Sequence, residues 1–98
     1  MEVRFLDSDL DRLETDPDFT AGHARAIVAS YRKVLQLIRA APDERDFYQF
    51  KSLHYEKLKG KRQHQRSMRL TKKWRLIIEL ETVDGHKMVV VVAIDDYH

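Results

Sequence analysis

The run from Lys87 to Ile94 (KMVVVVAI) limits the possible folds more than any other stretch of the sequence. Its residues are largely β-branched and almost uninterrupted, which is typical of a central strand that is buried on both faces. Asp84 and Gly85 lie just before it and form a strong signal for a hairpin turn. The strand on the other side of that turn is predicted over Trp74 to Glu81, with Trp74, Leu76, Ile78 and Leu80 on one face.

Two further strands are predicted by the same alternation. Glu2 to Asp7 places Val3 and Phe5 inward, and Arg66 to Thr71 alternates less regularly. The three later strands are expected to form an antiparallel meander. The partner of the first strand stays open, because it could pair with the last strand or with residues 68–71.

The clearest helix is predicted over Ala21 to Ala40, where apolar residues recur at spacings of three and four. Thr20 is a suitable N-cap, and Pro42 ends the helix at Ala41. The apolar face consists of Ala24, Ile27, Val28, Tyr31, Val34, Leu35 and Ile38. The opposite face, expected to lie in solvent, carries Arg25, Arg32, Lys33 and Arg39.

Shorter helical segments are predicted on both sides of this helix. A brief helix follows Ser8 or Asp9, either of which can cap it, and residues 43–50 add a turn or two anchored by Phe47 and Phe50. Helices therefore precede the meander, which is an α+β pattern. We expect N-terminal helices packed on a small, mostly antiparallel, twisted sheet, with residues 1–98 as a single domain.

Charge is distributed very unevenly along the chain. Residues 51–75 contain ten Lys or Arg and a single acid, a local charge of +9, whereas residues 1–50 carry −3 and residues 76–98 carry −4. Such a block is typical of a surface that binds a polyanion. A solvated loop is the simpler alternative.

Composition removes several classes of function. Without Cys, the chain has neither a disulfide framework nor a thiolate metal site. No apolar run approaches the roughly 20 residues of a membrane helix, and no secretion signal is present, so a cytoplasmic protein without membrane contact is expected. Glycine-rich nucleotide loops and paired metal-binding histidines are also absent. Neither a cofactor nor a metal is predicted.

Two places carry groups that are suited to proton transfer. His54 and His64 lie within the basic block, and Asp96, Tyr97 and His98 directly follow the last predicted strand. Carboxylate, phenol and imidazole are the groups of general acid–base chemistry, and imidazole titrates near neutral pH. A frayed tail is the alternative explanation for the final tripeptide.

Six short motifs follow one another in the second half of the chain: Leu53-His54, Leu58-Lys59-Gly60, Ser67 with Arg69, Trp74-Arg75, Asp84-Gly85 and Asp96-Tyr97-His98. Together they span residues 53–98, nearly half of the chain. None of them is specific alone, but the ordered set resembles the HigB branch of the RelE/ParE toxin superfamily, from bacterial type II toxin–antitoxin pairs. The resemblance implies the RelE-like microbial ribonuclease fold.

The resemblance also implies an mRNA endoribonuclease that acts on the translating ribosome and stops growth. Such an enzyme needs no metal when the RNA 2′-OH attacks the adjacent phosphate, but it needs a base, an acid and cations around the phosphorane. The implied catalytic residues are His98, Tyr97, Asp96, His54, Lys59 and Arg75, with His98 the first choice for proton transfer. The residues expected to contact RNA and ribosome are Lys57, Lys61, Arg62, Arg66, Arg69, Lys72 and Lys73.

The implied partners are a cognate helix-turn-helix antitoxin of the HigA type, the ribosome and its mRNA, with operator DNA bound only through the antitoxin. Two other functions compete with this one. A ParE-like toxin would inhibit DNA gyrase by protein contact and would not need an acid–base tail. A non-catalytic RNA- or DNA-binding module would need only the basic block.

Overall fold

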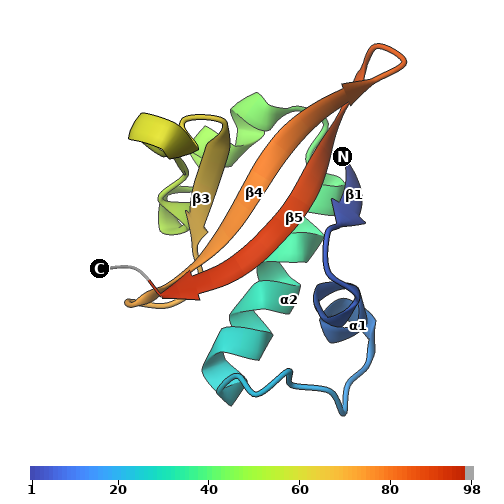
Figure 1. Cartoon of the computed structure of the whole chain (residues 1–98), viewed down its shortest axis with the longest axis vertical. Coiled ribbons are helices and arrows are strands. Elements are labelled where there is room, and N and C mark those ends of the chain that lie inside the picture. The colour runs from blue at the N-terminus through green and yellow to red at the C-terminus, as the bar shows by residue number, and fades with distance from the viewer. Residues whose placement is uncertain (97–98) are drawn as a thin grey trace.

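A computed structural model of the chain describes residues 1–96 and packs its two α-helices against one face of a five-stranded sheet (Figure 1). The strands are β1 (Glu2–Phe5), β2 (Glu56–Lys57), β3 (Gln65–Arg69), β4 (Trp74–Val83) and β5 (His86–Asp96). The helices are α1 (Ser8–Thr15) and α2 (Arg25–Ala40), with short 3₁₀ helices η1 (Glu44–Gln49), η2 (Lys51–Leu53) and η3 (Gly60–Arg62). The α+β prediction is confirmed.

The sheet has the strand order β1-β5-β4-β3-β2, and every neighbouring pair is antiparallel except β1 with β5. The first strand therefore pairs with the last strand, in parallel, with Val3 opposite Val89 and Phe5 opposite Val91. β5 has a neighbour on each side, and its residues Val89, Val90 and Val91, which alternate between the two faces of the sheet, are all buried. The central, doubly buried strand predicted for this run is thus confirmed over these three residues.

The core lies between α2 and the inner face of the sheet. From α2, Tyr31, Leu35 and Ile38 are completely buried, and they pack in one cluster with residues such as Leu76 and Val91. The Tyr31 hydroxyl donates a hydrogen bond of 2.7 Å to the carbonyl of Leu10. Burial raises the pKa of Tyr31, so this phenol remains a donor throughout the physiological range.

The start of α2 differs from the prediction. Ala21 and Gly22 have φ angles of +53° and +80°, which interrupt a helix, and the Thr20 carbonyl accepts a bond from the His23 amide instead. The helix consequently begins at Arg25, with Ala24 as an N-cap that makes no side-chain bond, so the predicted Thr20 cap is wrong. Its end at the residue before Pro42 is confirmed.

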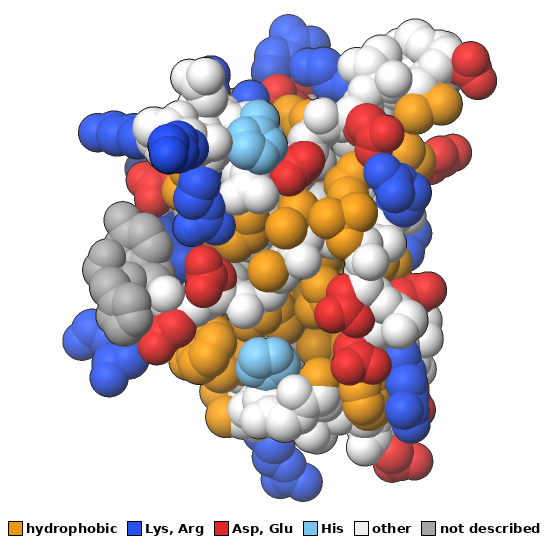
Figure 2. Space-filling view, in the orientation of Figure 1, with side chains coloured by type: hydrophobic (Ala, Val, Ile, Leu, Met, Phe, Trp, Pro, Cys, Tyr) orange, Lys and Arg blue, Asp and Glu red, His pale blue; other side chains and the backbone are white. Residues whose placement is uncertain are grey.

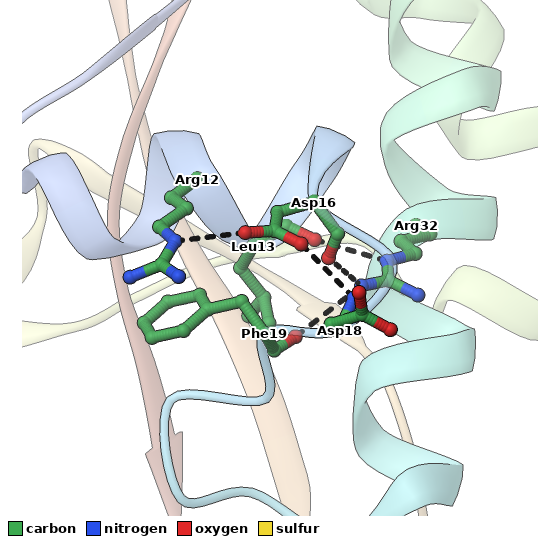
Figure 3. A network of polar contacts seen from close by, with 6 residues as sticks. All are labelled: Arg12, Leu13, Asp16, Asp18, Phe19 and Arg32. Atoms are coloured by element: carbon green, nitrogen blue, oxygen red, sulfur yellow. Dashed lines mark hydrogen bonds and ion pairs between the residues drawn. The ribbon is translucent and has the colours of Figure 1, made fainter.

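Arg32 was expected in solvent, but its guanidinium binds the segment that connects the two α-helices (Figure 3). It donates to the carbonyls of Leu13, Asp16 and Phe19 at 2.9, 2.7 and 3.3 Å. These groups lie at and beyond the end of α1, where carbonyls have no partner within the helix. Arg32 therefore supplies hydrogen-bond donors to carbonyls at the end of α1, beside the bond from the Asp16 amide to the Arg12 carbonyl.

Two smaller predictions are also corrected. The cap of α1 is Asp7 and neither Ser8 nor Asp9, because the Asp7 carboxylate accepts from the amide of Asp9 at 2.7 Å. In η1, Phe47 is buried as expected, but Phe50 is 40% exposed and does not anchor the segment. The capping box of η1, made by Asp43 and Asp46, supplies a local restraint instead.

Candidate functional site

His54 lies where η2 leads into β2, between two residues that are anchored in the core. Leu53 is 2% exposed and Tyr55 is 8% exposed, whereas His54 itself is exposed. Its backbone has φ +45° and ψ +48°, the left-handed conformation that L-residues avoid at a cost of roughly 1–2 kcal/mol. A histidine held in this way is a candidate functional residue, since such strain tends to persist at sites that use it.

Three separate contacts hold His54 in place. Its amide donates to the carbonyl of Lys51 at 3.1 Å, and its own carbonyl accepts from Nη1 of Arg75 at 3.2 Å. The imidazole Nε2 lies 3.3 Å from Nη1 of Arg69. One guanidinium, that of Arg69, therefore contacts the imidazole, and a second, that of Arg75, holds the backbone of the same residue.

The register of the sheet explains why these side chains meet. Arg69 at the end of β3 is paired directly with Arg75 at the start of β4. On β2, Glu56 lies 3.6 Å from Nη2 of Arg75, and it is paired with Ser67 of β3. The Ser67 hydroxyl is fully buried and has no hydrogen-bond partner within residues 1–96.

The end of β5 borders the same group of residues. Arg75 is paired with Asp95, and the adjacent Trp74 is paired with Asp96. The Asp95 carboxylate lies 3.6 Å from Nη1 of Arg62, which brings η3 to this end of the sheet. The predicted catalytic residues Tyr97 and His98 lie outside the described residues.

Tyr55 supports the site from the core side. Its hydroxyl donates to the Glu44 carboxylate at 2.8 Å, and its ring makes edge-to-face contacts with Phe47 and Tyr48. Burial, together with the bond to Glu44, raises the pKa of Tyr55, so the phenol stays neutral and this bond persists. The residue next to His54 is thereby held in a single position.

The other predicted residues are more scattered. The Lys59 side chain makes no hydrogen bond or ion pair with residues 1–96, and it lies in the β2–β3 connection. Arg66 lies apart from His54 and pairs with Glu44 at 3.6 Å. The remaining lysines of the predicted RNA surface are exposed, in β2, η3 and the β3–β4 turn: Lys57, Lys61, Lys72 and Lys73.

Three contacts around His54 were not foreseen from the sequence. Arg69 had been assigned to the RNA backbone, although its guanidinium reaches the imidazole, and Glu56 and Asp95 had no assigned role. No alternation links Glu56 to His54, because the left-handed backbone of His54 breaks the extended chain before β2. The Arg69 contact depends on strand pairing, so no local pattern predicts it.

The site lies on an open surface. Figure 2 shows Lys and Arg side chains gathered beside the apolar centre of the outer face of the sheet, on the side of η3 and β3. A hollow of about 690 Å³ lies at the other end of the sheet, around the β4–β5 hairpin, and does not include His54. Within residues 1–96, no three potential ligands are grouped to hold a metal ion, and no helix is long and apolar enough to cross a bilayer.

Comparison with known proteins identifies the family of this chain. Residues 3–98 match the HigB-like toxin family, described as the RelE-like toxin of the type II toxin–antitoxin system HigB. The chain therefore belongs to this family of toxins, and membership implies an antitoxin partner. No curated protein matches the chain.

A solved structure that is similar to this chain is the YoeB/ParE toxin from Agrobacterium tumefaciens. The two share 18% sequence identity, and the match covers 100% of each chain with a TM-score of 0.61. At this identity the likeness concerns the fold alone. It agrees with the RelE-like architecture that the motifs implied.

Proposed function

We propose that this toxin is a metal-independent endoribonuclease that cuts mRNA on the translating ribosome and thereby inhibits translation. The observation that carries the proposal is that Arg69 contacts the imidazole of His54 while Arg75 binds the backbone carbonyl of the same residue. Cleavage of RNA through its 2′-OH needs a proton acceptor and fixed positive charge around the phosphorane. This group of residues supplies both.

In the proposed reaction the 2′-oxygen loses its proton and forms a bond to phosphorus, while the bond from phosphorus to the 5′-oxygen breaks. The departing 5′-oxygen takes up a proton, which leaves a cyclic phosphate and a free hydroxyl. We assign proton transfer first to His98, with His54 as its partner. Tyr97 would donate a proton or stack on a base, and Asp96 would orient an imidazole or accept a proton.

Arg75 and Lys59 are the proposed stabilisers of the phosphorane charge, and Arg is well suited to phosphate because it can donate two parallel bonds. Arg75 is already aligned with His54, whereas Lys59 would have to approach from the β2–β3 connection. Its lack of a partner among residues 1–96 leaves the Lys59 ammonium available for phosphate.

The openness of the site supports action on the ribosome. The hollow of about 690 Å³ does not include His54, and the hollow lined by Leu53 and Arg69 measures only about 170 Å³. Positioning of mRNA must then come largely from a larger surface, and a ribosome offers RNA backbone to the exposed cations of the +9 segment. A cytoplasmic location follows from this substrate.

Replacing His98 with Ala tests the catalytic assignment. We expect His98→Ala to abolish mRNA cleavage by the toxin on translating ribosomes while circular dichroism stays unchanged, because a proton-transfer group is lost. His86→Ala, at the hairpin tip, is the matched control and should cut normally. Undiminished cleavage by His98→Ala would remove His98 from the mechanism. Inhibition of DNA gyrase without RNA fragments would instead favour the ParE-like alternative.

The proposed antitoxin is a helix-turn-helix protein of the HigA type that covers the basic surface or displaces the tail, and through which alone operator DNA is bound. Co-expression of the toxin with the product of a neighbouring open reading frame tests this partner. Co-purification and loss of mRNA cleavage are the expected results. A neighbouring product that neither binds nor inhibits the toxin would contradict the assignment.

A further inference from the structure

The contact between Arg69 and His54 fixes the tautomer of the imidazole. A guanidinium has five N–H donors and no acceptor, and it stays charged in proteins. In the 3.3 Å contact between Arg69 Nη1 and His54 Nε2, the imidazole nitrogen must therefore be the acceptor. The neutral ring then carries its proton on Nδ1, and the lone pair of Nε2 is engaged by Arg69.

A lone pair that is engaged in this way cannot accept a proton from RNA. If Nε2 took the 2′-OH proton, the ring would become an imidazolium with no lone pair left, and it would repel the adjacent guanidinium. The Arg69 contact and proton transfer to Nε2 are therefore mutually exclusive. For His54 to act, Arg69 has to leave.

We propose that Arg69 masks Nε2 of His54 in the free toxin and that a phosphate of the bound RNA draws Arg69 away, which frees His54 to act as the general base. This inference rests on the proposed ribonuclease function and deepens it, because it gives His54 one of the two proton-transfer roles. Nε2 takes the 2′-OH proton as the new O–P bond forms, and a separate acid protonates the departing 5′-oxygen. Arg69 is then a positioning residue whose departure is triggered by substrate.

The exchange is favourable because the two partners of Arg69 differ in charge. Hydrogen bonds from a guanidinium to an anionic phosphate are charge-assisted, and they are stronger than a bond to a neutral ring. Within residues 1–96, no carboxylate pairs with Arg69; the nearby Glu56 pairs with Arg75 instead. A phosphate therefore has to displace only a neutral acceptor.

Removal of Arg69 leaves His54 positioned. The amide of His54 stays bonded to Lys51 and its carbonyl to Arg75, and the flanking Leu53 and Tyr55 stay buried. Only the imidazole gains a free nitrogen. The contacts that hold the backbone of His54 are therefore different from the contact that covers Nε2.

Nitrogen NMR of the histidine side chains tests this arrangement without RNA. In ¹⁵N-labelled free toxin at about pH 8.5, well above the ordinary imidazole pKa, two-bond ¹⁵N–¹H correlations report which ring nitrogen carries the proton. We expect the Nδ1–H form for His54. Inorganic phosphate, used as the probe, should invert the ratio of the two tautomers toward Nε2–H. Arg69→Met should show the inverted ratio without phosphate, and phosphate should then have no further effect.

Arg25→Met, which removes an exposed cation on α2, is the control and should behave as wild type. If Arg69→Met does not fold, the phosphate titration of the wild-type toxin decides alone. An Nε2–H tautomer in free wild-type toxin, or a ratio that phosphate leaves unchanged, overturns the masking role even if the toxin cuts mRNA. A toxin that shows the tautomer exchange but cuts no mRNA overturns the ribonuclease proposal instead.

Discussion

His54 combines a strained backbone with a side chain that contacts a guanidinium. Its left-handed conformation is maintained by bonds to Lys51 and Arg75 and by the buried residues on either side. The free-energy cost of that conformation arises from steric contact of the Cβ atom, which glycine lacks. Backbone strain and the imidazole contact can therefore be separated by two substitutions.

We expect His54→Gly to be more stable than His54→Ala by about 1 kcal/mol. Both variants lose the contact with Arg69, so the difference between their free energies of unfolding measures the backbone strain alone. Urea unfolding of the two variants measures it. The same pair at His64, whose φ is not positive, is the control and should favour Ala or show no preference. Equal stability of the two variants at position 54 would mean that the left-handed conformation carries no strain.

At the scale of elements, the junction between α1 and α2 depends on polar contacts that cross the loop. Arg32 binds three carbonyls, and Arg12 pairs with Asp16 at 3.0 Å while its guanidinium lies 4.1 Å from the centre of the Phe19 ring. Both arginines act on the segment that joins the helices, so the packing of α1 depends on side chains as much as on the core. Two predictions follow from this junction.

Arg32→Met should lower the free energy of unfolding by about 2 kcal/mol, because charged hydrogen bonds to partly buried carbonyls are lost while the aliphatic stem is kept. Lys33→Met, at an exposed position on the same helix, should change stability by less than about 0.5 kcal/mol. Urea unfolding monitored by circular dichroism compares them. A loss of the same size in both variants would exclude a special role for Arg32.

The stability that Asp16 contributes should depend on pH. The Asp18 amide, and then Arg12, hold the pKa of Asp16 below its ordinary value of 3.8. Since the folded pKa is below the unfolded one, this stabilisation is complete above the unfolded value and is lost as pH falls through the folded value.

We therefore expect wild type to exceed Asp16→Asn in unfolding free energy by a constant amount between pH 7 and about 5, and this excess should shrink as the pH passes below 3.8. Urea titrations across this range test it. An excess that is the same at every pH would show that ionisation of Asp16 does not contribute.

On the scale of the whole molecule, the uneven distribution of charge along the sequence gives different regions of the surface different charges. The basic residues of η3 and β3 lie beside the open sheet face, at the end of β5 where the His54 group is found (Figure 2). A ribosome that approaches this side meets cations and the proposed site together. Binding should therefore depend strongly on salt.

Charge reversal at Lys61 and Arg62, both in η3, should weaken ribosome association at low salt. It should also reduce the slope of log K against log salt by about 1 for each phosphate contact that is lost. Co-sedimentation with ribosomes at several salt concentrations provides the slope. Reversal of Arg25 and Lys33 on α2 changes net charge equally and should leave the slope unchanged. The same slope for both double variants would show that η3 is not the RNA surface.

Much of the fold could be predicted because its signals are local. The β4–β5 hairpin follows from an Asp-Gly turn between apolar runs, and the end of α2 follows from Pro42. The start of α2 was missed because Ala21 adopts a left-handed turn that nothing in its own side chain indicates. His54 and Arg75 were both predicted for the site, and they do contact each other.

The sequence by itself determined the element types, the burial of the last strand, the concentration of positive charge and the ordered motifs of a HigB-like toxin. All of these can be read along the chain without knowing which distant residues meet. The tertiary structure alone decided that β1 pairs with β5, that Arg32 turns inward and that Arg69 contacts Nε2 of His54. These contacts join residues that are distant in the chain, so they exist only once the helices and strands have packed together.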